Sequence, residues 1–220
     1  ALGKPAYNRT VPADLVHLVR HGEVENPTRI LYGQLEGFGL SELGHRMAEA
    51  AAASLDGRSI TGILSSPLQR AQESAAPWAA RFGRGVVLDE RLIEPRNRFQ
   101  GINVRRDLRR RPGLWPYAVN PLRPSWGESF ASIRARMMSV IAEAHDVASG
   151  GEIVLVSHQL PIWMVARSVA GRRPAPAPRA RRCTLSSITT LAKEGERFVE
   201  VDYQEPAGHL LAQSIDLGAV

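Results

Sequence analysis

An Arg-His-Gly-Glu segment, residues 20–23, stands at the end of a short apolar run. The run, residues 15–20, has the composition of a buried parallel strand. In an open parallel sheet, ligands bind beyond the carboxyl ends of the strands. Arg20 and His21 suit an anionic group there, and Gly22 lets the backbone approach it closely. On its own, the segment does not show whether His21 belongs to an anion-binding site or is a structural histidine.

Two further segments bring the same residue types to the ends of strands. Arg70 lies in the first turn of a helix predicted after a strand at residues 60–64, where free backbone N–H groups favour an anion. His158 directly follows a strand predicted at residues 152–156. Because parallel strands end at one edge of a sheet, two imidazoles and two guanidiniums should converge on one crevice. Such a cluster indicates a phosphate site.

The elements that must position these side chains alternate between strands and helices. Strands are predicted at residues 15–20, 60–64, 86–88, 152–156, 186–191 and 198–203. Helices are predicted from the Ser41 cap, from Pro67 behind a Ser66 cap, over residues 130–148 and from near Pro161. This order predicts an α/β fold, a three-layer sandwich whose mainly parallel central sheet has helices on both faces. We expect one domain over residues 1–220, with a core at about 15–203, and a surface loop at 171–182.

Composition narrows the class of protein. The chain has 220 residues, with 28 Lys+Arg against 22 Asp+Glu, hence a net charge of +6. This charge is modest for a nucleic-acid-binding protein, so we expect no nucleic acid partner. The single cysteine, Cys183, excludes an intramolecular disulfide and an all-cysteine metal site. The sequence shows no membrane-spanning run and no apolar leader at its start, so we expect a cytoplasmic protein without a membrane partner.

Six blocks of sequence together resemble the histidine phosphatase superfamily, in its phosphoglycerate mutase-like branch (branch 1). They follow the family's order across residues 15–191. The blocks are LVRHGE (18–23), GLSELG (39–44), SSPLQRAQES (65–74), LIEPRNRFQG (92–101), WGES (126–129) and VLVSHQ (154–159).

The resemblance implies a mechanism. His21 would be the nucleophile that forms a phosphohistidine, and Glu94 would protonate the leaving oxygen. Apolar neighbours should raise the pKa of Glu94, and nearby arginines should oppose this. The phosphoryl oxygens would be held by Arg20, Arg70 and His158, with further contacts from Asn26 and Gln159. The reaction would need neither a metal nor a cofactor.

The chain departs from the family pattern at three places. Asn26 stands one position early and the usual hydroxyl residue before it is missing, which puts its phosphate contact in doubt. Gln159 replaces the glycine that usually follows the second histidine, so its side chain should narrow the pocket. The glycine expected between Glu94 and Gly101 is also absent. None of these changes removes a core catalytic residue.

Three functions remain open, of which a phosphatase acting on a small-molecule phosphomonoester is favoured. A mutase is the first alternative, but residues 94–98 differ from the corresponding mutase block. A catalytically weak basic protein that binds an anionic partner is the second, with Arg172, Arg173, Arg179, Arg181 and Arg182 as its surface. The arginines of residues 105–111 lie where the resemblance implies a lid over the pocket, at about residues 95–126. They either select a second anionic group or form a solvated helix face.

Overall fold

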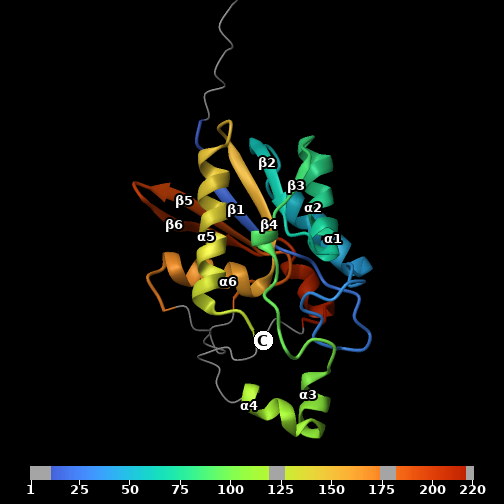
Figure 1. Ribbon diagram of the computed structural model, residues 1–220. Helices are drawn as coiled ribbons and strands as arrows, with labels where there is room; N and C mark the ends of the chain where they lie inside the picture. Colours follow the sequence, from blue (N-terminus) through green and yellow to red (C-terminus); the bar gives the residue numbers. More distant parts are fainter. Residues whose placement is uncertain (1–10, 119–126, 174–181, 217–220) are drawn as a thin grey trace, which may run out of the picture.

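A six-stranded mixed sheet forms the centre of the molecule (Figure 1). The structure is a computed structural model that describes residues 11–118, 127–173 and 182–216. The strand order is β3-β2-β4-β1-β5-β6. The strands are β1 (Leu15–Arg20), β2 (Ile60–Ser65), β3 (Val86–Leu88), β4 (Glu152–Ser157), β5 (Ile188–Glu194) and β6 (Arg197–Gln204). The first four are parallel, whereas β5 and β6 pair antiparallel at one edge.

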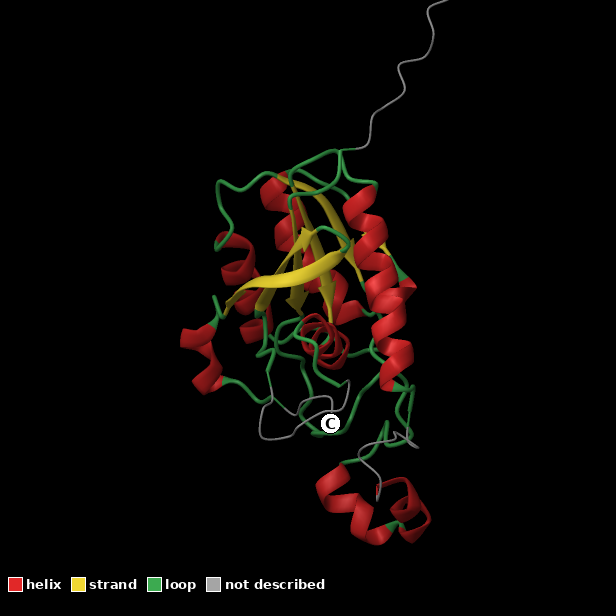
Figure 2. Cartoon of the chain, turned by 90° about the vertical axis from the view of Figure 1, so that its left-hand side faces the viewer, coloured by secondary structure: helices red, strands yellow, loops and turns green. Residues whose placement is uncertain are grey.

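Helices cover both faces of the sheet (Figures 1 and 2). α1 (Glu42–Ala53) and α2 (Gln69–Phe82) pack on one face, where they share a buried cluster with β2 and β4. α5 (Phe130–Asp146) and α6 (Gln159–Val169) cover the other face. The predicted α/β sandwich is therefore confirmed.

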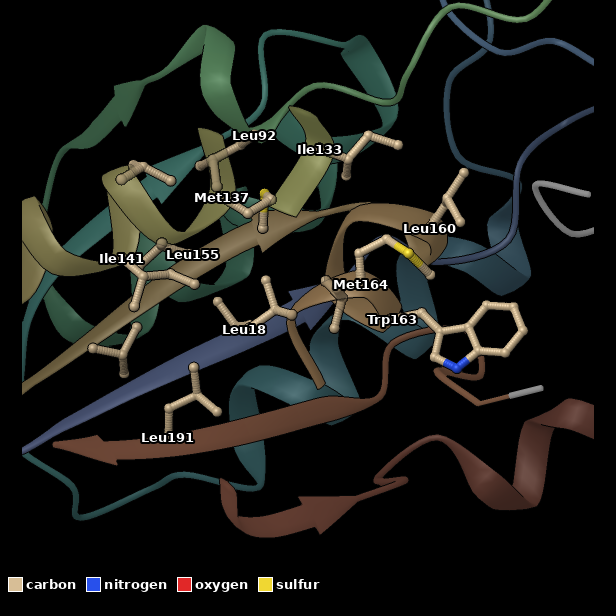
Figure 3. Packing of buried hydrophobic residues seen from close by; sticks show 14 of the residues in the cluster. Leu18, Leu92, Ile133, Met137, Ile141, Leu155, Leu160, Trp163, Met164 and Leu191 are labelled. Atoms are coloured by element: carbon tan, nitrogen blue, oxygen red, sulfur yellow. The ribbon is translucent and has the colours of Figure 1, made fainter. Parts of the chain in front are cut away.

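The larger hydrophobic cluster lies between α5, α6 and the sheet (Figure 3). Successive strand residues point to opposite faces, so Leu18 and Leu155 join this cluster while Val19 and Val156 join the other. Met137 and Ile141 come from one helical face of α5 and are fully buried. The two clusters fix β1 and β4 at the centre of the sheet, where the carboxyl ends of both strands meet.

One predicted helix start was wrong. α2 begins at Gln69, and its N-cap, Leu68, makes no side-chain cap hydrogen bond. The Ser66 hydroxyl, predicted to cap this helix, instead lies 2.8 Å from Nε2 of His158. α6 begins at Gln159, close to the predicted start near Pro161. The Ser41 cap of α1 was predicted correctly, since its side chain accepts a hydrogen bond from the Gly44 amide.

The segment after β3 is made of short helices. η1 (Glu90–Leu92) packs against α5, and then α3 (Val104–Asp107), η2 (Leu108–Arg110), η3 (Pro112–Leu114) and α4 (Trp115–Ala118) lie away from the sheet (Figures 1 and 2). This region includes most of the predicted lid. Residues 119–126 of the lid, with Trp126, lie outside the described residues.

A C-terminal segment packs back onto the body of the molecule. After β6, η5 (Gly208–Gln213) buries Leu210 beside Ala207, Met47 and Leu185. This segment lies beyond the predicted core, which ends at about residue 203. No described helix is both long and apolar enough to cross a bilayer.

Candidate active site

Five predicted residues meet at the carboxyl edge of the sheet, and all five are buried: Arg20, His21, Arg70, Glu94 and His158. The register of the two central strands explains why the histidines meet. Arg20 of β1 is paired with Ser157 of β4, so His21 and His158 each follow a matched strand end. Their ring centroids lie 5.1 Å apart. Arg20, His21, Arg70 and Glu94 line one cavity together with Gln159.

The imidazole of His21 is held in one tautomer. Its Nδ1 lies 2.7 Å from the carbonyl oxygen of Gly22, which can only accept a hydrogen bond, so Nδ1 carries the proton. Nε2 therefore keeps its lone pair. Burial, followed by the charges of Arg70 and Arg20, lowers the pKa of His21 well below its usual 6.5. The ring is neutral at pH 7 and carries an unprotonated nitrogen, as a nucleophile requires.

The imidazole of His158 faces Ser66 on one side and Glu94 on the other. Ser66 Oγ lies 2.8 Å from His158 Nε2 and accepts a long hydrogen bond, 3.4 Å, from the Leu68 amide. We assign the Ser66 hydroxyl as the donor in this contact and Nε2 as its acceptor. His158 then carries its own proton on Nδ1, a buried atom without a hydrogen-bond partner, 3.8 Å from Glu94 Oε2. Burial, with the charge of Arg70 next, lowers the pKa of His158 well below 6.5, so this ring is a neutral donor.

Glu94 has the protonation expected of a general acid. Burial raises the pKa of its carboxyl group to about 7, and the charges of Arg70 and Arg20 oppose this rise. The raised pKa of Glu94, and the opposing effect of the arginines, agree with the prediction from the sequence. Gln34 fixes the loop, because its Nε2 donates a hydrogen bond of 2.5 Å to the carbonyl oxygen of Glu94. Near pH 7 the carboxyl group can both give and take a proton.

The two arginines leave donor atoms available in the site. Arg70 donates from Nη2 to the carbonyl oxygen of Gly33 at 2.6 Å, and its guanidinium lies 4.7 Å from the ring centroid of Tyr32. Arg20 donates from Nη1 to the carbonyl oxygen of Cys183 and forms an ion pair with Asp216. The Nε atoms of both arginines are buried without a hydrogen-bond partner in the described structure. Two buried positive charges beside two neutral imidazoles make the site strongly attractive to an anion.

The other two predicted contact residues are placed differently. Asn26 holds its own turn, with Nδ2 bonded to the carbonyl oxygen of Ile30 and Oδ1 accepting from the Ile30 amide. It lines a neighbouring cavity rather than the one that contains His21. Gln159 does line the catalytic cavity, and its side-chain amide donates to the carbonyl oxygens of Arg182 and Cys183. A phosphate contact from either residue stays a prediction.

The arginine cluster of the lid does not line this cavity. Arg109, Arg110 and Arg111 are exposed and line none of the described cavities around the site. His17, which was not a candidate, is buried in β1 and bonded to Thr190 and Glu152, as expected of a structural histidine. Arg179 and Arg181 lie outside the described residues. Within the described part of the chain, no three His, Cys, Asp or Glu side chains are grouped closely enough to hold a metal ion.

Sequence reasoning missed four residues that contact the site: Tyr32, Gln34, Ser66 and Asp216. Tyr32 and Gln34 belong to an irregular loop without hydrophobic periodicity. Ser66 precedes Pro67, a pattern typical of a helix start, and was therefore interpreted as a helix cap. Asp216 pairs with a residue 196 positions earlier in the chain, and no local pattern indicates such a contact.

Comparison with known proteins identifies the family of the chain. The family model of the histidine phosphatase superfamily (branch 1) matches residues 16–206. An uncharacterised protein of Mycobacterium tuberculosis, Rv0525, is 47% identical over 194 residues, which cover 87% of this chain and 96% of that protein. The probable phosphoglycerate mutase GpmB of Cronobacter sakazakii is 33% identical over 79% of this chain and 83% of its own.

A solved structure has the same overall fold. The mycobacterial glucosyl-3-phosphoglycerate phosphatase Rv2419c superposes with a TM-score of 0.70 at 27% identity, covering 88% of this chain and 99% of that one. Further structures of that enzyme contain VO3 or inorganic phosphate. Given the family match over most of its length, the chain belongs to the histidine phosphatase superfamily (branch 1).

Proposed function

We propose that the protein is a metal-independent hydrolase of small-molecule phosphomonoesters that acts through a phosphohistidine on His21. One observation carries the proposal: a neutral imidazole with a free Nε2 lies beside two buried guanidiniums and a carboxyl group with a pKa of about 7. The groups cover the three tasks of the reaction, which are attack on phosphorus, stabilisation of charge on the phosphoryl oxygens, and proton transfer.

In the first step, Nε2 of His21 forms a bond to phosphorus while the bond from phosphorus to the leaving oxygen breaks. Glu94 gives its proton to that oxygen, and the alcohol departs. Arg20, Arg70 and the Nδ1 proton of His158 bind the phosphoryl oxygens as charge spreads over them. In the second step, ionised Glu94 takes a proton from water. The water oxygen forms a bond to phosphorus while the bond from phosphorus to Nε2 of His21 breaks, and phosphate is released.

A phosphatase is favoured over a mutase by the lining of the cavity. Arg20 and Arg70 are the cations among the described residues that line it, and both are assigned to the phosphoryl group. A mutase acting on phosphoglycerate also needs a cation for the substrate carboxylate. The similarity to a glucosyl-3-phosphoglycerate phosphatase supports hydrolysis, while the similarity to GpmB keeps the mutase as the second candidate.

Phosphate release from an aryl phosphate and from a panel of phosphomonoesters, with a chelator present, tests the proposal. We expect steady release of phosphate that the chelator does not diminish. Interconversion of phosphoglycerates without net phosphate release would favour the mutase. The absence of turnover, together with salt-sensitive binding of nucleic acid, would favour the basic binding protein.

The pH dependence should follow Glu94. For an alkyl phosphate, kcat/KM should fall as the pH rises through about 7, because the carboxyl group then loses the proton that the leaving oxygen needs. His21 should not limit activity on the acid side, since its pKa lies well below 6.5. A pH profile of kcat/KM checks this. The alkaline decline should be absent from Glu94→Gln, and its persistence there would assign it to another group.

Ser66 should act as a positioning residue for His158. Ser66→Ala leaves Nε2 without its donor and frees the ring to take the other tautomer, so we expect kcat/KM to fall by about tenfold. ¹⁵N NMR of the imidazole should show the Nδ1–H tautomer in the wild-type protein. Ser54→Ala, which removes a hydroxyl bonded to the Ala51 carbonyl at the end of α1, is the control. A wild-type ring protonated on Nε2 would contradict the assignment.

A further inference from the structure

A carboxylate of the chain itself pairs with one of the two arginines assigned to the phosphoryl group. Asp216 pairs with both ends of the Arg20 guanidinium: Nη1 donates to Oδ2 at 2.8 Å and Nη2 donates to Oδ1 at 2.7 Å. This fork-to-fork geometry is the one in which a guanidinium binds a phosphoryl group. The Arg20 side chain is only 2% exposed, so its charge requires a counter-charge in the free protein.

The segment that carries Asp216 is held in place by defined contacts. Leu210 of η5 is buried against Met47 and Leu185. The Ile215 amide donates a hydrogen bond of 2.6 Å to Glu23 Oε1, and the other oxygen of Glu23 accepts one from the Ser41 hydroxyl. Glu23, which follows His21 by two residues, thus connects the tail to the start of α1. The carboxylate of Asp216 is delivered to Arg20 by this anchored segment.

Each partner of this ion pair lines a cavity. The cavity lined by Arg20, His21, Arg70 and Glu94 has a volume of about 20 Å³, and Asp216 does not line it. Asp216 lines the neighbouring cavity, which has a volume of about 130 Å³, and its side chain is 29% exposed. This neighbouring cavity offers space for the carboxylate once a ligand displaces it from Arg20.

We propose that Asp216 is an internal competitor of the substrate: its carboxylate occupies the Arg20 fork in the free protein, and a phosphoryl group binds there only by displacing it. This inference rests on the proposed function of the site. Because the ligand must replace a carboxylate, Asp216 sets the affinity for the phosphoryl group and favours dianionic ligands over singly charged ones. The residue thereby determines specificity without taking part in bond formation.

Calorimetric titration with inorganic phosphate tests the proposal without requiring turnover. Asp216→Asn keeps the size of the side chain and removes its charge. We expect phosphate to bind roughly tenfold tighter to this variant. This corresponds to a wild-type protein in which Arg20 is not paired with Asp216 in about a tenth of the molecules. Asp202→Asn removes the same charge from an exposed position on β6 and should leave the affinity unchanged. Asp216→Ser replaces the carboxylate by a smaller hydroxyl side chain and should behave like Asp216→Asn.

A measurement on the wild-type protein provides a second readout. Saturation with phosphate should shift the NMR signal of the Ile215 amide, because displacement of Asp216 disturbs the bond from Ile215 to Glu23. Equal or weaker phosphate binding by both Asp216 variants, with clear binding by the wild type, would overturn the competitor role and leave the phosphate site standing. If neither wild type nor variants bind phosphate, the proposed function fails as well.

Discussion

Replacement of His21 by alanine should lower kcat for every phosphomonoester by a factor on the order of 10⁵, since the nucleophile is lost and direct attack by water replaces it. The structure provides no ready substitute among the described residues of the cavity. His158 is neutral, but its Nε2 is engaged by Ser66 and its Nδ1 carries the proton. The residual rate should come from binding and charge stabilisation by the two arginines.

Phosphate release measured under saturating substrate checks this expectation. His45→Ala is the matched control, because His45 lies exposed on α1, away from the site, and its loss should leave kcat unchanged. In the wild-type protein, rapid quenching with labelled substrate should place the label on the peptide that contains His21, with phosphorus on Nε2. Retention of more than a few per cent of the activity in His21→Ala would remove this residue from the nucleophile's role.

The central part of the site could be predicted because it depends on strand ends. A parallel sheet brings the carboxyl ends of its strands to one edge, so a residue that directly follows a strand is placed by the fold alone. His21 follows β1 and His158 follows β4, and the two strands are neighbours in register. Arg70 was predicted for the same reason, since it lies in the first turn of the helix that follows β2.

The residues that complete the site could not be predicted in this way. The Ser66-Pro67 pair has the sequence of a helix cap, but the helix starts later because Ser66 is placed against His158. That contact joins residues 92 positions apart. Asp216 reaches Arg20 from the irregular segment that follows η5, where no apolar periodicity predicts its position. Contacts of this kind depend on how loops pack onto an assembled sheet, and that packing has no local signature.

Substitution of Glu94 by glutamine should have an effect that depends on the leaving group. Glutamine keeps the size of the side chain but has no acidic proton to give. For alkyl phosphates, kcat should fall by about 10²- to 10⁴-fold, the usual contribution of a general acid. For aryl phosphates the leaving oxygen is already stable as an anion, so the first step should change little.

A series of phosphomonoesters with graded leaving-group pKa values measures this dependence. In the wild-type protein the rate of the first step should vary weakly with leaving-group pKa, because Glu94 neutralises the developing charge. In Glu94→Gln the same plot should become steep, and the two lines should converge at the most acidic leaving groups. Glu90→Gln provides the control, as Glu90 is exposed on η1 four residues earlier and should give the wild-type slope.

Since Glu94 also activates the water that hydrolyses the phosphohistidine, the Glu94→Gln variant should accumulate phosphoenzyme when an aryl phosphate is the substrate. Equal loss for alkyl and aryl substrates in the first step, measured by a burst of alcohol release, would assign Glu94 to a role other than proton donor.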